Sequence, residues 1–344
     1  MPEEIVPMKS LRVRAAVSVV ALGLLAGCGG PGQDVVDASN VPRLRARTAD
    51  ALNGRPQVVM PRGPRSVFTT YRATGEDGTK VVHTKWHGRV SGYTGDMWAW
   101  VPPQYNQAKY ARSGFPVLIA LPGAWGYPSN YWTDAPFALE ERLSEWAKEG
   151  KTLPFILVMP VLNPRKTYYD GSDIPGQPKM GSWLTRDVPE FARTNFRTYA
   201  TRDGWAFMGS SSGGFAALKA VLKEPQRFKA AIVNGPDTAP DSPLWKGHPA
   251  EKLANDPRHL ARQLAARGGP QVYLAFELGS KEAAVPDVKR FISGYTDGVR
   301  GPIHSTLFEI PDGVHSGHTY IKRMPESLHW ISEQMQGPVA APLV

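Results

Sequence analysis

The sequence predicts an α/β fold in which a mainly parallel, doubly wound sheet is covered by helices on both faces. Short apolar segments rich in β-forming residues alternate with helical segments after about residue 90. Several of the apolar segments are continuously apolar, which is typical of strands that are buried on both faces. The order strand, helix, strand, helix favours parallel pairing through right-handed crossovers.

The expected elements follow from these patterns. Strands are predicted at 96–103, 115–123, 154–160, 204–209, 230–235, 271–279 and 303–313. Helices are predicted at 135–150, 185–196, 213–224 and 326–335. Ligands of such sheets bind beyond the carboxyl ends of the strands, so the loops that follow the predicted strands are the expected place for chemistry.

The composition indicates one globular domain, which we expect at 65–344. The chain has 344 residues, of which 42% are hydrophobic and 21% charged, and it contains ten tryptophans. These values are ordinary for a folded domain with a substantial core. No internal repeat and no second domain is recognisable, and frequent Gly and Pro predict long loops.

The first 27 residues are expected to be an export signal. A basic region with Lys9, Arg12 and Arg14 precedes an apolar stretch over 15–26, which is too short to span a bilayer. The stretch ends in "LAGC", which resembles the lipobox of bacterial lipoproteins. The resemblance implies that Cys28 carries lipid and anchors the exported chain to the outer face of the cell membrane; a plain secretory signal is the alternative.

Residues 28–64 are predicted to be a flexible tether between that anchor and the domain. They are rich in Gly, Pro and polar residues and show no sustained period. Cys28 is the only cysteine, so an internal disulfide is excluded and the core must stabilise the exported domain.

The positive charge of the chain does not indicate a nucleic-acid partner. The formal net charge is +9. The predicted signal contributes three basic and two acidic residues, a net +1, so +8 remains. Because no basic run or aromatic-basic repeat accompanies this charge, nucleic-acid binding is not expected. A basic surface that faces anionic envelope polymers is the simpler interpretation.

The strongest local motif points to a nucleophilic serine at Ser211. The segment "WAFMGSSSGGFAALKAV" places an apolar strand, the pattern G-x-S-x-G and a small-residue helix in direct succession. A sharp strand-to-helix turn of this kind exposes the serine and needs glycine two residues before and two after it, here Gly209 and Gly213. Ser212 fits less well, because Ser210 would then occupy the tight position.

A nucleophilic serine needs a basic histidine, and two candidates follow the last predicted strand. His315 and His318 both lie in "IPDGVHSGHTY". In the fold with this motif the histidine follows the final strand. His315 is favoured because it directly follows the strand exit, and His318 is then expected to line the substrate pocket.

Three carboxylates compete to orient the histidine. The acid should follow the strand at 271–279. Glu282 lies in the loop after this strand and is favoured. Glu277 lies inside the strand, where a buried carboxylate needs its own partner. Asp287 follows Pro286 and is better placed to cap the next helix.

The oxyanion of an acyl intermediate needs two backbone N–H groups. Ser212 follows the nucleophile and is expected to supply one. The segment "ALPGAWG" after the strand at 115–123 places Ala124, or else Trp125, for the second. Aromatic residues beside it either pack ordinarily or form a wall for a sugar or aromatic group, with Trp125 expected in the pocket; these residues are Trp125, Tyr127, Tyr131 and Trp132.

No metal or cofactor is expected. His83 and His87 could share one face of a strand, but no third ligand lies near them in the sequence. Asp170, Asp173 and Asp187 are interpreted as part of a solvated Gly/Pro-rich loop rather than a calcium site.

These motifs together resemble the putative-esterase family of α/β-hydrolases, which includes esterase D, feruloyl esterases and the antigen 85 mycolyltransferases. The resemblance rests on "VSGYTGDMWAWVPPQYN", "FPVLIALPGAWG", "GSSSGGFAALKAVLKEPQRFKAAIVNG" and "DGVHSGHTY", and covers roughly residues 85 to 337. It implies an α/β-hydrolase fold with Ser211, His315 and Glu282 as triad and Ala124 and Ser212 as oxyanion amides. Pro122 and Gly317 depart from the family pattern, which expects His or Asp and Trp there.

The expected function is hydrolysis of carboxylic esters through an acyl-enzyme intermediate, without a cofactor. The substrate would be a small-molecule or envelope ester. Two alternatives remain open at this point: an acyltransferase that acts on envelope sugars or lipids, and a non-catalytic binding protein on a hydrolase scaffold.

Overall fold

The computed structural model describes residues 36–45, 57–74, 78–296 and 301–341 of the chain. The predicted signal and Cys28 lie outside these residues. No helix among the described residues has the length and apolarity needed to cross a membrane.

A central mixed sheet organises the described domain. Its strands follow the order β11-β10-β9-β8-β5-β6-β4-β3-β2. Their bounds are β2 Thr69–Ala73, β3 Lys80–His87, β4 Thr94–Trp100, β5 Val117–Leu121, β6 Ile156–Pro160, β8 Trp205–Ser210, β9 Ala230–Asn234, β10 Val272–Gly279 and β11 Ile303–Ile310. A separate two-stranded sheet pairs β1 (Val58–Val59) with β7 (Thr198–Tyr199).

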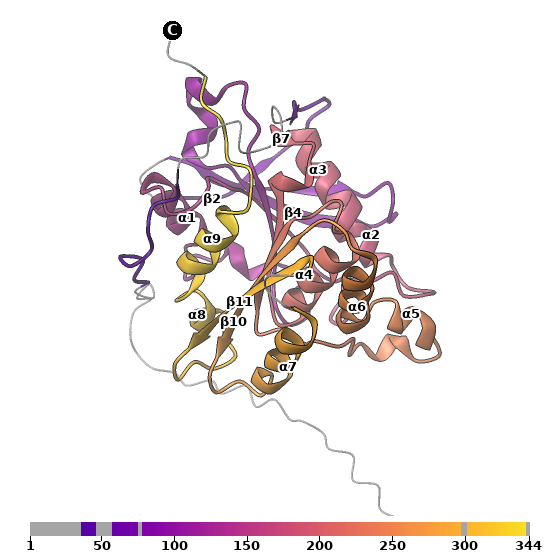
Figure 1. The fold of residues 1–344 in the computed structure, drawn as a ribbon. Coiled ribbons are helices and arrows are strands. Elements are labelled where there is room, and N and C mark those ends of the chain that lie inside the picture. Colours follow the sequence, from indigo (N-terminus) through magenta and orange to yellow (C-terminus); the bar gives the residue numbers. More distant parts are fainter. Residues whose placement is uncertain (1–35, 46–56, 75–77, 297–300, 342–344) are drawn as a thin grey trace, which may run out of the picture. The chain divides into compact units, whose positions relative to one another are not determined.

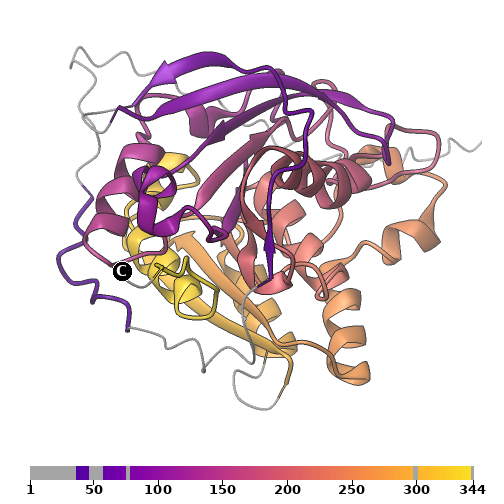
Figure 2. The ribbon, with the colours of Figure 1, turned by 90° about the horizontal axis from the view of Figure 1, so that it is seen from above.

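Parallel and antiparallel strands occupy different halves of this sheet. The pairs among β6, β5, β8, β9, β10 and β11 are all parallel. The strands β4, β3 and β2 continue the sheet in antiparallel pairing, and Figure 2 shows these N-terminal strands at the edge opposite to β10 and β11. The predicted mainly parallel sheet is therefore confirmed, with an antiparallel extension.

Helices cover both faces of the sheet (Figure 1). The bounds of the helices are α1 Leu139–Lys148, α2 Met180–Ser182, α3 Val188–Asn195, α4 Ser212–Lys223, α5 Pro249–Leu253, α6 Pro257–Arg267, α7 Val285–Tyr295, α8 Gly317–Tyr320 and α9 Met324–Ser332. Trp183–Asp187 (η5) is a short π-helix. Short 3-10 helices are η2 Pro103–Asn106, η3 Ala108–Tyr110, η4 Tyr131–Thr133, η6 Arg202–Gly204 and η7 Pro243–Trp245.

Contacts at the carboxyl ends of the parallel strands show which face of the central sheet α4 and α9 each cover. Gly209 faces α4, since a Cβ there would lie 2.3 Å from the Gly213 oxygen. Successive strand residues point to opposite faces, so Ser210 faces away from α4. Glu277 shares that face by register through Asn234 and contacts Ser327 of α9. Hence α9 lies opposite α4, as Figure 1 also shows.

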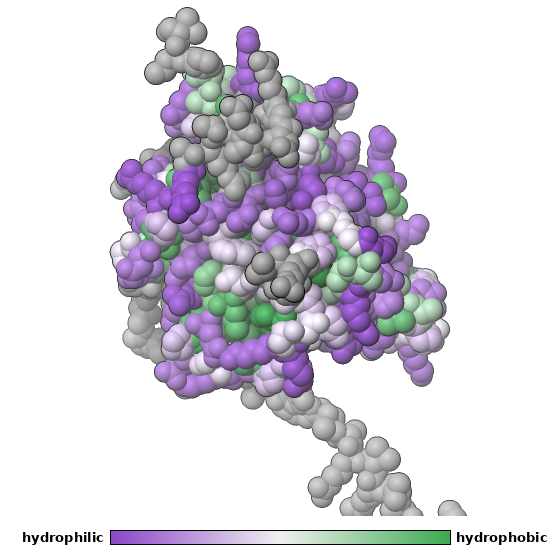
Figure 3. Space-filling view, in the orientation of Figure 1, coloured by the Kyte–Doolittle hydropathy of each residue, from purple (hydrophilic) through white to green (hydrophobic). Residues whose placement is uncertain are grey.

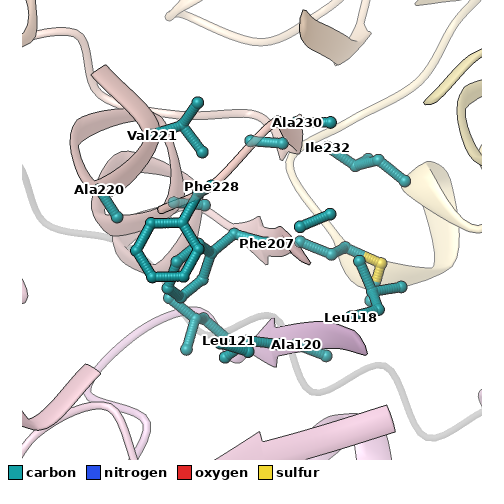
Figure 4. Packing of buried hydrophobic residues seen from close by; sticks show 14 of the residues in the cluster. Leu118, Ala120, Leu121, Phe207, Ala220, Val221, Phe228, Ala230 and Ile232 are labelled. Carbon is teal, nitrogen blue, oxygen red and sulfur yellow. The ribbon is translucent and has the colours of Figure 1, made fainter. Parts of the chain in front are cut away.

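The core lies on both faces of the parallel strands. All five residues of β5, all five of β6 and all five of β9 are buried. Figure 4 shows apolar side chains of α4, including Ala220 and Val221, packed near Phe207 and Phe228, whose ring centroids are 4.7 Å apart. Burial on both faces explains why these strands are continuously apolar in the sequence.

The packed domain begins earlier than the predicted boundary at residue 65. Ala38 and Val41 are buried, and the Leu44 N–H donates to the Gly150 oxygen at 2.7 Å. The strand Val58–Val59 pairs with β7. Parts of the range 28–64 are thus held by apolar and backbone contacts that a Gly/Pro-rich composition did not reveal, and this corrects the tether boundary. On the face of the molecule seen in Figure 3, hydrophilic residues dominate and hydrophobic areas are smaller.

Candidate active site

Ser211 occupies a strained turn between β8 and α4. Its backbone has φ 52° and ψ −121°, a region that residues with a Cβ rarely adopt. The turn requires glycine on both sides of Ser211. A Cβ at Gly213 would lie 2.3 Å from the Pro122 oxygen, and a Cβ at Gly209 would lie 2.3 Å from the Gly213 oxygen. The strand, turn and helix expected from the G-x-S-x-G motif are therefore present, with Ser211 immediately before the N-terminus of α4.

Two unused backbone donors lie beside Ser211. The Ser212 hydroxyl donates a hydrogen bond to the Ala124 oxygen, so the loop after β5 contacts the first residue of α4. Within the described part of the chain, neither the Ala124 N–H nor the Ser212 N–H donates a hydrogen bond to another residue. Such free amides at a helix N-terminus can stabilise an oxyanion.

Two buried side chains, Asn130 and Trp132, attach the loop after β5 to the sheet. Asn130 Nδ2 donates to the Ala120 oxygen at 2.8 Å and to the Pro160 oxygen at 2.9 Å. Trp132 Nε1 donates to the Leu121 oxygen at 3.0 Å. Ala124 itself has φ 51°. The loop that carries Ala124 is therefore tied to the ends of β5 and β6 by hydrogen bonds from Asn130 and Trp132.

His315 and Glu282 are in direct contact. His315 Nδ1 lies 2.6 Å from Glu282 Oε2, and the other carboxylate oxygen, Oε1, accepts the Gly279 N–H at 2.6 Å. The Glu282 side chain is 1% exposed and that of His315 is 51% exposed. This hydrogen bond raises the pKa of His315, and the charges of Glu282 and Asp237 raise it further, while burial opposes them.

The two other candidate acids have different partners. Glu277 is fully buried and its Oε1 accepts a hydrogen bond from the Ser327 hydroxyl. Asp287 lies in the first turn of α7, is exposed, and pairs with Arg290. Burial raises the pKa of Glu277 to about 8. Only Glu282 among the three contacts His315 in the described residues.

The sheet brings these groups to one edge. Because β5, β8, β10 and β11 belong to one parallel array, the loops that carry Ala124, Ser211, Glu282 and His315 all follow carboxyl ends of strands. Among the described residues Ser211 Oγ makes no hydrogen bond, whereas the Ser211 N–H donates to the Asn234 oxygen at 2.8 Å. A serine-to-histidine hydrogen bond often tightens only when substrate is bound.

A row of buried polar side chains lies on the α9 face of this edge. Ser210, Asn234 and Glu277 are register neighbours on β8, β9 and β10. In the described structure Ser210 Oγ, both polar atoms of the Asn234 side chain and Glu277 Oε2 are buried without a hydrogen-bond partner. A neutral Glu277 carboxyl avoids the cost of burying a charge there.

The residues predicted for the substrate pocket border the same edge. Trp125 is 43% exposed and its ring centroid lies 6.3 Å from that of Tyr168. His318 is exposed and stacks on Phe137 with centroids 4.9 Å apart. A Cβ at Gly317 would lie 2.7 Å from Phe137, so Phe137 fills the space that a larger side chain at this departure from the family pattern would need.

An acidic group near His315 was not anticipated from the sequence. Asp237 and Asp241 lie in the loop after β9. Burial and the neighbouring Asp170 and Asp237 raise the pKa of Asp241 to about 7, and burial also raises the pKa of Asp237, although the nearby His315 lowers it. The rule that ligands bind beyond strand ends could have directed attention to this loop.

Tyr320 is the second group that sequence reasoning missed. It ends α8, is 1% exposed, and its hydroxyl lies 2.9 Å from both Glu282 Oε2 and His315 Nδ1. No local pattern identifies it, because its role in this contact depends on how α8 folds back over the loop after β10.

The histidines and aspartates considered as metal ligands have other partners. His83 Nε2 lies 2.9 Å from Asp96 Oδ1, and His87 Nδ1 lies 2.9 Å from Thr94 Oγ1. No group of three His, Cys, Asp or Glu in the described ranges is arranged to hold a metal ion.

The three aspartates, interpreted from the sequence as part of a solvated loop, include two buried ones. Asp170 accepts from Trp245 Nε1 at 2.6 Å, and Asp187 accepts from the Val90 and Ser91 N–H groups at 2.9 Å. Asp173 is the exposed member and accepts hydrogen bonds from the Ser182 N–H at 2.8 Å and from the Ser182 hydroxyl at 2.6 Å. They fasten separate loops, which corrects the interpretation for Asp170 and Asp187.

Comparison with known proteins agrees with this fold and motif set. Residues 99–294, more than half of the chain, match the family model "Esterase: Putative esterase". A solved structure titled ferulic acid esterase is 16% identical, with a TM-score of 0.60, and the match covers 75% of this chain and 99% of that one.

Two further solved structures show the same fold. The fluorophosphonate-binding serine hydrolase FphF of Staphylococcus aureus is 15% identical with a TM-score of 0.60, over 74% of this chain and 98% of its own. The S-formylglutathione hydrolase of Agrobacterium tumefaciens is 19% identical with a TM-score of 0.58, over 78% of this chain and 100% of its own. From the family match, this chain belongs to the esterase family and is a serine ester hydrolase with the α/β-hydrolase fold.

Proposed function

We propose that this esterase hydrolyses carboxylic esters through an acyl-enzyme on Ser211, with His315 as base and Glu282 as its orienting acid. His315 Nε2 removes the Ser211 proton as Oγ attacks the ester carbonyl, and the amides of Ala124 and Ser212 hold the oxyanion. His315 returns the proton to the departing alcohol. Water, deprotonated by the same nitrogen, then attacks the acyl group, and Ser211 leaves with the proton.

The contact between His315 and Glu282 carries this proposal. A carboxylate can only accept hydrogen bonds, so the 2.6 Å contact fixes the proton on Nδ1 and leaves Nε2 as the base. The strained turn at Ser211 and the two unused amides support the same roles.

Activity on p-nitrophenyl esters tests the proposal. Ser211→Ala is expected to lower kcat by a thousandfold or more, on the order seen for serine hydrolase triads. Ser210→Ala is the matched control, because its hydroxyl lies on the α9 face and is assigned no catalytic role. Labelling with a fluorophosphonate followed by peptide mass analysis should place the adduct on Ser211. An active Ser211→Ala enzyme, or an adduct on another serine, would refute the assignment.

Transfer of the acyl group to a sugar is a second candidate. Trp125 and Tyr127 are exposed aromatic side chains in the loop after β5, and aromatic faces commonly stack on sugar rings. Product analysis with a sugar acceptor present separates the two outcomes. A hydrolase releases free acid at the same rate with or without acceptor, whereas a transferase converts part of the acyl group into a new ester.

We further propose that the enzyme is exported and held at the outer face of the membrane by lipid on Cys28. The support is the basic and apolar segment that ends in "LAGC" and the absence of any other thiol in the chain. Membrane fractions should contain the wild type, while Cys28→Ser should be released or remain unprocessed. Equal fractionation of the two, with cleavage elsewhere, would contradict the anchor.

A further inference from the structure

The Tyr320 hydroxyl contacts both His315, the proposed base, and Glu282, the proposed acid. Its hydroxyl donates to Glu282 Oε2 at 2.9 Å, which is the same oxygen that His315 Nδ1 approaches to 2.6 Å. The hydroxyl oxygen also lies 2.9 Å from Nδ1. Since Oε1 is occupied by the Gly279 N–H at 2.6 Å, both oxygens of this buried carboxylate have partners.

The fold reserves space for this hydroxyl at the end of β9. Gly235 has φ 47°, and a Cβ there would lie 2.0 Å from the Tyr320 oxygen and 2.5 Å from Glu282 Oε2. The Gly235 N–H donates to the backbone oxygen of Glu277 at 2.9 Å, and this hydrogen bond fixes Gly235 against β10. Any L-residue at this position would take the place of the hydroxyl, so the contact depends on glycine.

We propose that Tyr320 is a positioning residue of this hydrolase, acting through Glu282 and His315; the proposal rests on the function proposed above. The hydroxyl prevents the carboxylate from turning away from Nδ1 and offsets part of its charge. The imidazole therefore keeps Nδ1 protonated and Nε2 directed toward the serine. Without the hydroxyl, Glu282 Oε2 loses a charge-assisted hydrogen bond in a buried site.

The test is Tyr320→Phe compared with Tyr199→Phe. Tyr199 is an equally buried tyrosine whose hydroxyl donates to the Gly337 oxygen at 2.7 Å, and it contacts none of the proposed catalytic residues. Tyr320→Phe should lower kcat by about 10- to 100-fold, the range for a lost hydrogen bond to a charged group. KM should change by less than about threefold, because no uniform substrate contact is removed. Tyr199→Phe should leave both values unchanged.

The pH profile separates positioning from a merely structural role. The acid limb of kcat/KM reports the protonation of His315. The groups that face this cluster are Glu282 and Glu277 from β10 and its loop, Asp237 from the loop after β9, and Tyr131 from η4. Tyr320→Phe leaves these groups in place and removes only the proton that offsets Glu282, so the acid limb should move to higher pH.

The outcomes are distinguishable from failure of the proposed function. Rates of the variants that retain Ser211 are expressed per serine labelled to completion by a fluorophosphonate, so partial loss of folded protein does not count as lost catalysis. The rate of Ser211→Ala, which has no serine to label, is expressed per total protein. If Ser211→Ala or Glu282→Gln retains full activity, the proposed function is wrong. If those variants are impaired while Tyr320→Phe matches Tyr199→Phe in kcat and in acid limb, only the positioning role is wrong. A Tyr320→Phe protein that does not fold would assign Tyr320 a structural role and overturn the proposal.

Discussion

The strain at Ser211 predicts an inverted ranking of alanine and glycine substitutions. Both Ser211→Ala and Ser211→Gly remove the hydroxyl and should be inactive. They differ in the backbone, because φ 52° and ψ −121° are costly for alanine and not for glycine. A residue with a Cβ in such a region loses about 1–3 kcal/mol, whereas glycine costs roughly 0.5–1 kcal/mol through the entropy of the unfolded chain. Ser211→Gly should therefore be more stable than Ser211→Ala by about 1 kcal/mol.

Urea unfolding of both variants measures this difference, and in a domain of this size it corresponds to a shift in Tm of roughly 2 °C. The matched pair is Ser210→Ala and Ser210→Gly. Ser210 is the last residue of β8 and is not among the residues with positive φ, so there glycine should be the less stable by about 0.5–1 kcal/mol. If glycine is also the less stable at Ser211, the turn stores no strain and the reasoning from its dihedral angles fails.

Three further predictions follow from the groups around the site. Glu277 has a folded pKa of about 8 against an ordinary value of 4.5; its contribution to stability is therefore complete below pH 4.5 and is lost as pH rises toward 8, by on the order of 5 kcal/mol. Glu277→Gln should flatten the free energy of unfolding between pH 5 and 8 in urea titrations while kcat persists, and an unchanged slope would exclude Glu277 as its source. Glu282→Gln should lower kcat by roughly a hundredfold or more and, because Glu282 raises the pKa of His315, it should move the acid limb of kcat/KM to lower pH; a near wild-type profile would remove Glu282 from the triad. Gly235→Ala should destabilise the fold by about 1–2 kcal/mol because of the positive φ at this position, and it should lower kcat because the added Cβ displaces Tyr320. Steady-state kinetics on the folded fraction measure this effect. The control is Gly247→Ala, whose Cβ would meet nothing within 4 Å.

The buried half of the fold could be predicted from the sequence, and the exposed edge could not. The strands β4, β5, β6, β8, β9, β10 and β11 all coincide with predicted segments, because burial on both faces makes most of them continuously apolar. By contrast, β2 and β3 carry many polar and charged residues at the outer edge of the sheet. These two strands lack a continuous apolar run; β3 is defined by its pairing with β4, and β2 by its pairing with β3.

Neither α6 nor α7 is among the helices predicted from periodicity, although each begins at a local signal. The helix α6 is mostly polar and buries only Pro257, Leu260, Ala261 and Leu264. A local signal was available, since the Asp256 side chain accepts a hydrogen bond from the Arg258 N–H and caps the helix. In α7 the residue Pro286 correctly indicated a helix start.

In the candidate site, chain order could indicate which groups meet but not how they are supported. Ser211, Glu282 and His315 each follow a recognisable strand, so their loops could be assigned to one edge in advance. Tyr320 and Asp237 reach that edge from α8 and from the loop after β9. Their contacts depend on loop conformation, which is set by side chains distant in sequence.

Solvent reaches the two ends of the His315–Glu282 hydrogen bond very unequally. The carboxylate is sealed, while about half of the imidazole is open to bulk water. In the proposed mechanism, the water that releases the acyl group can therefore reach the imidazole directly from solution.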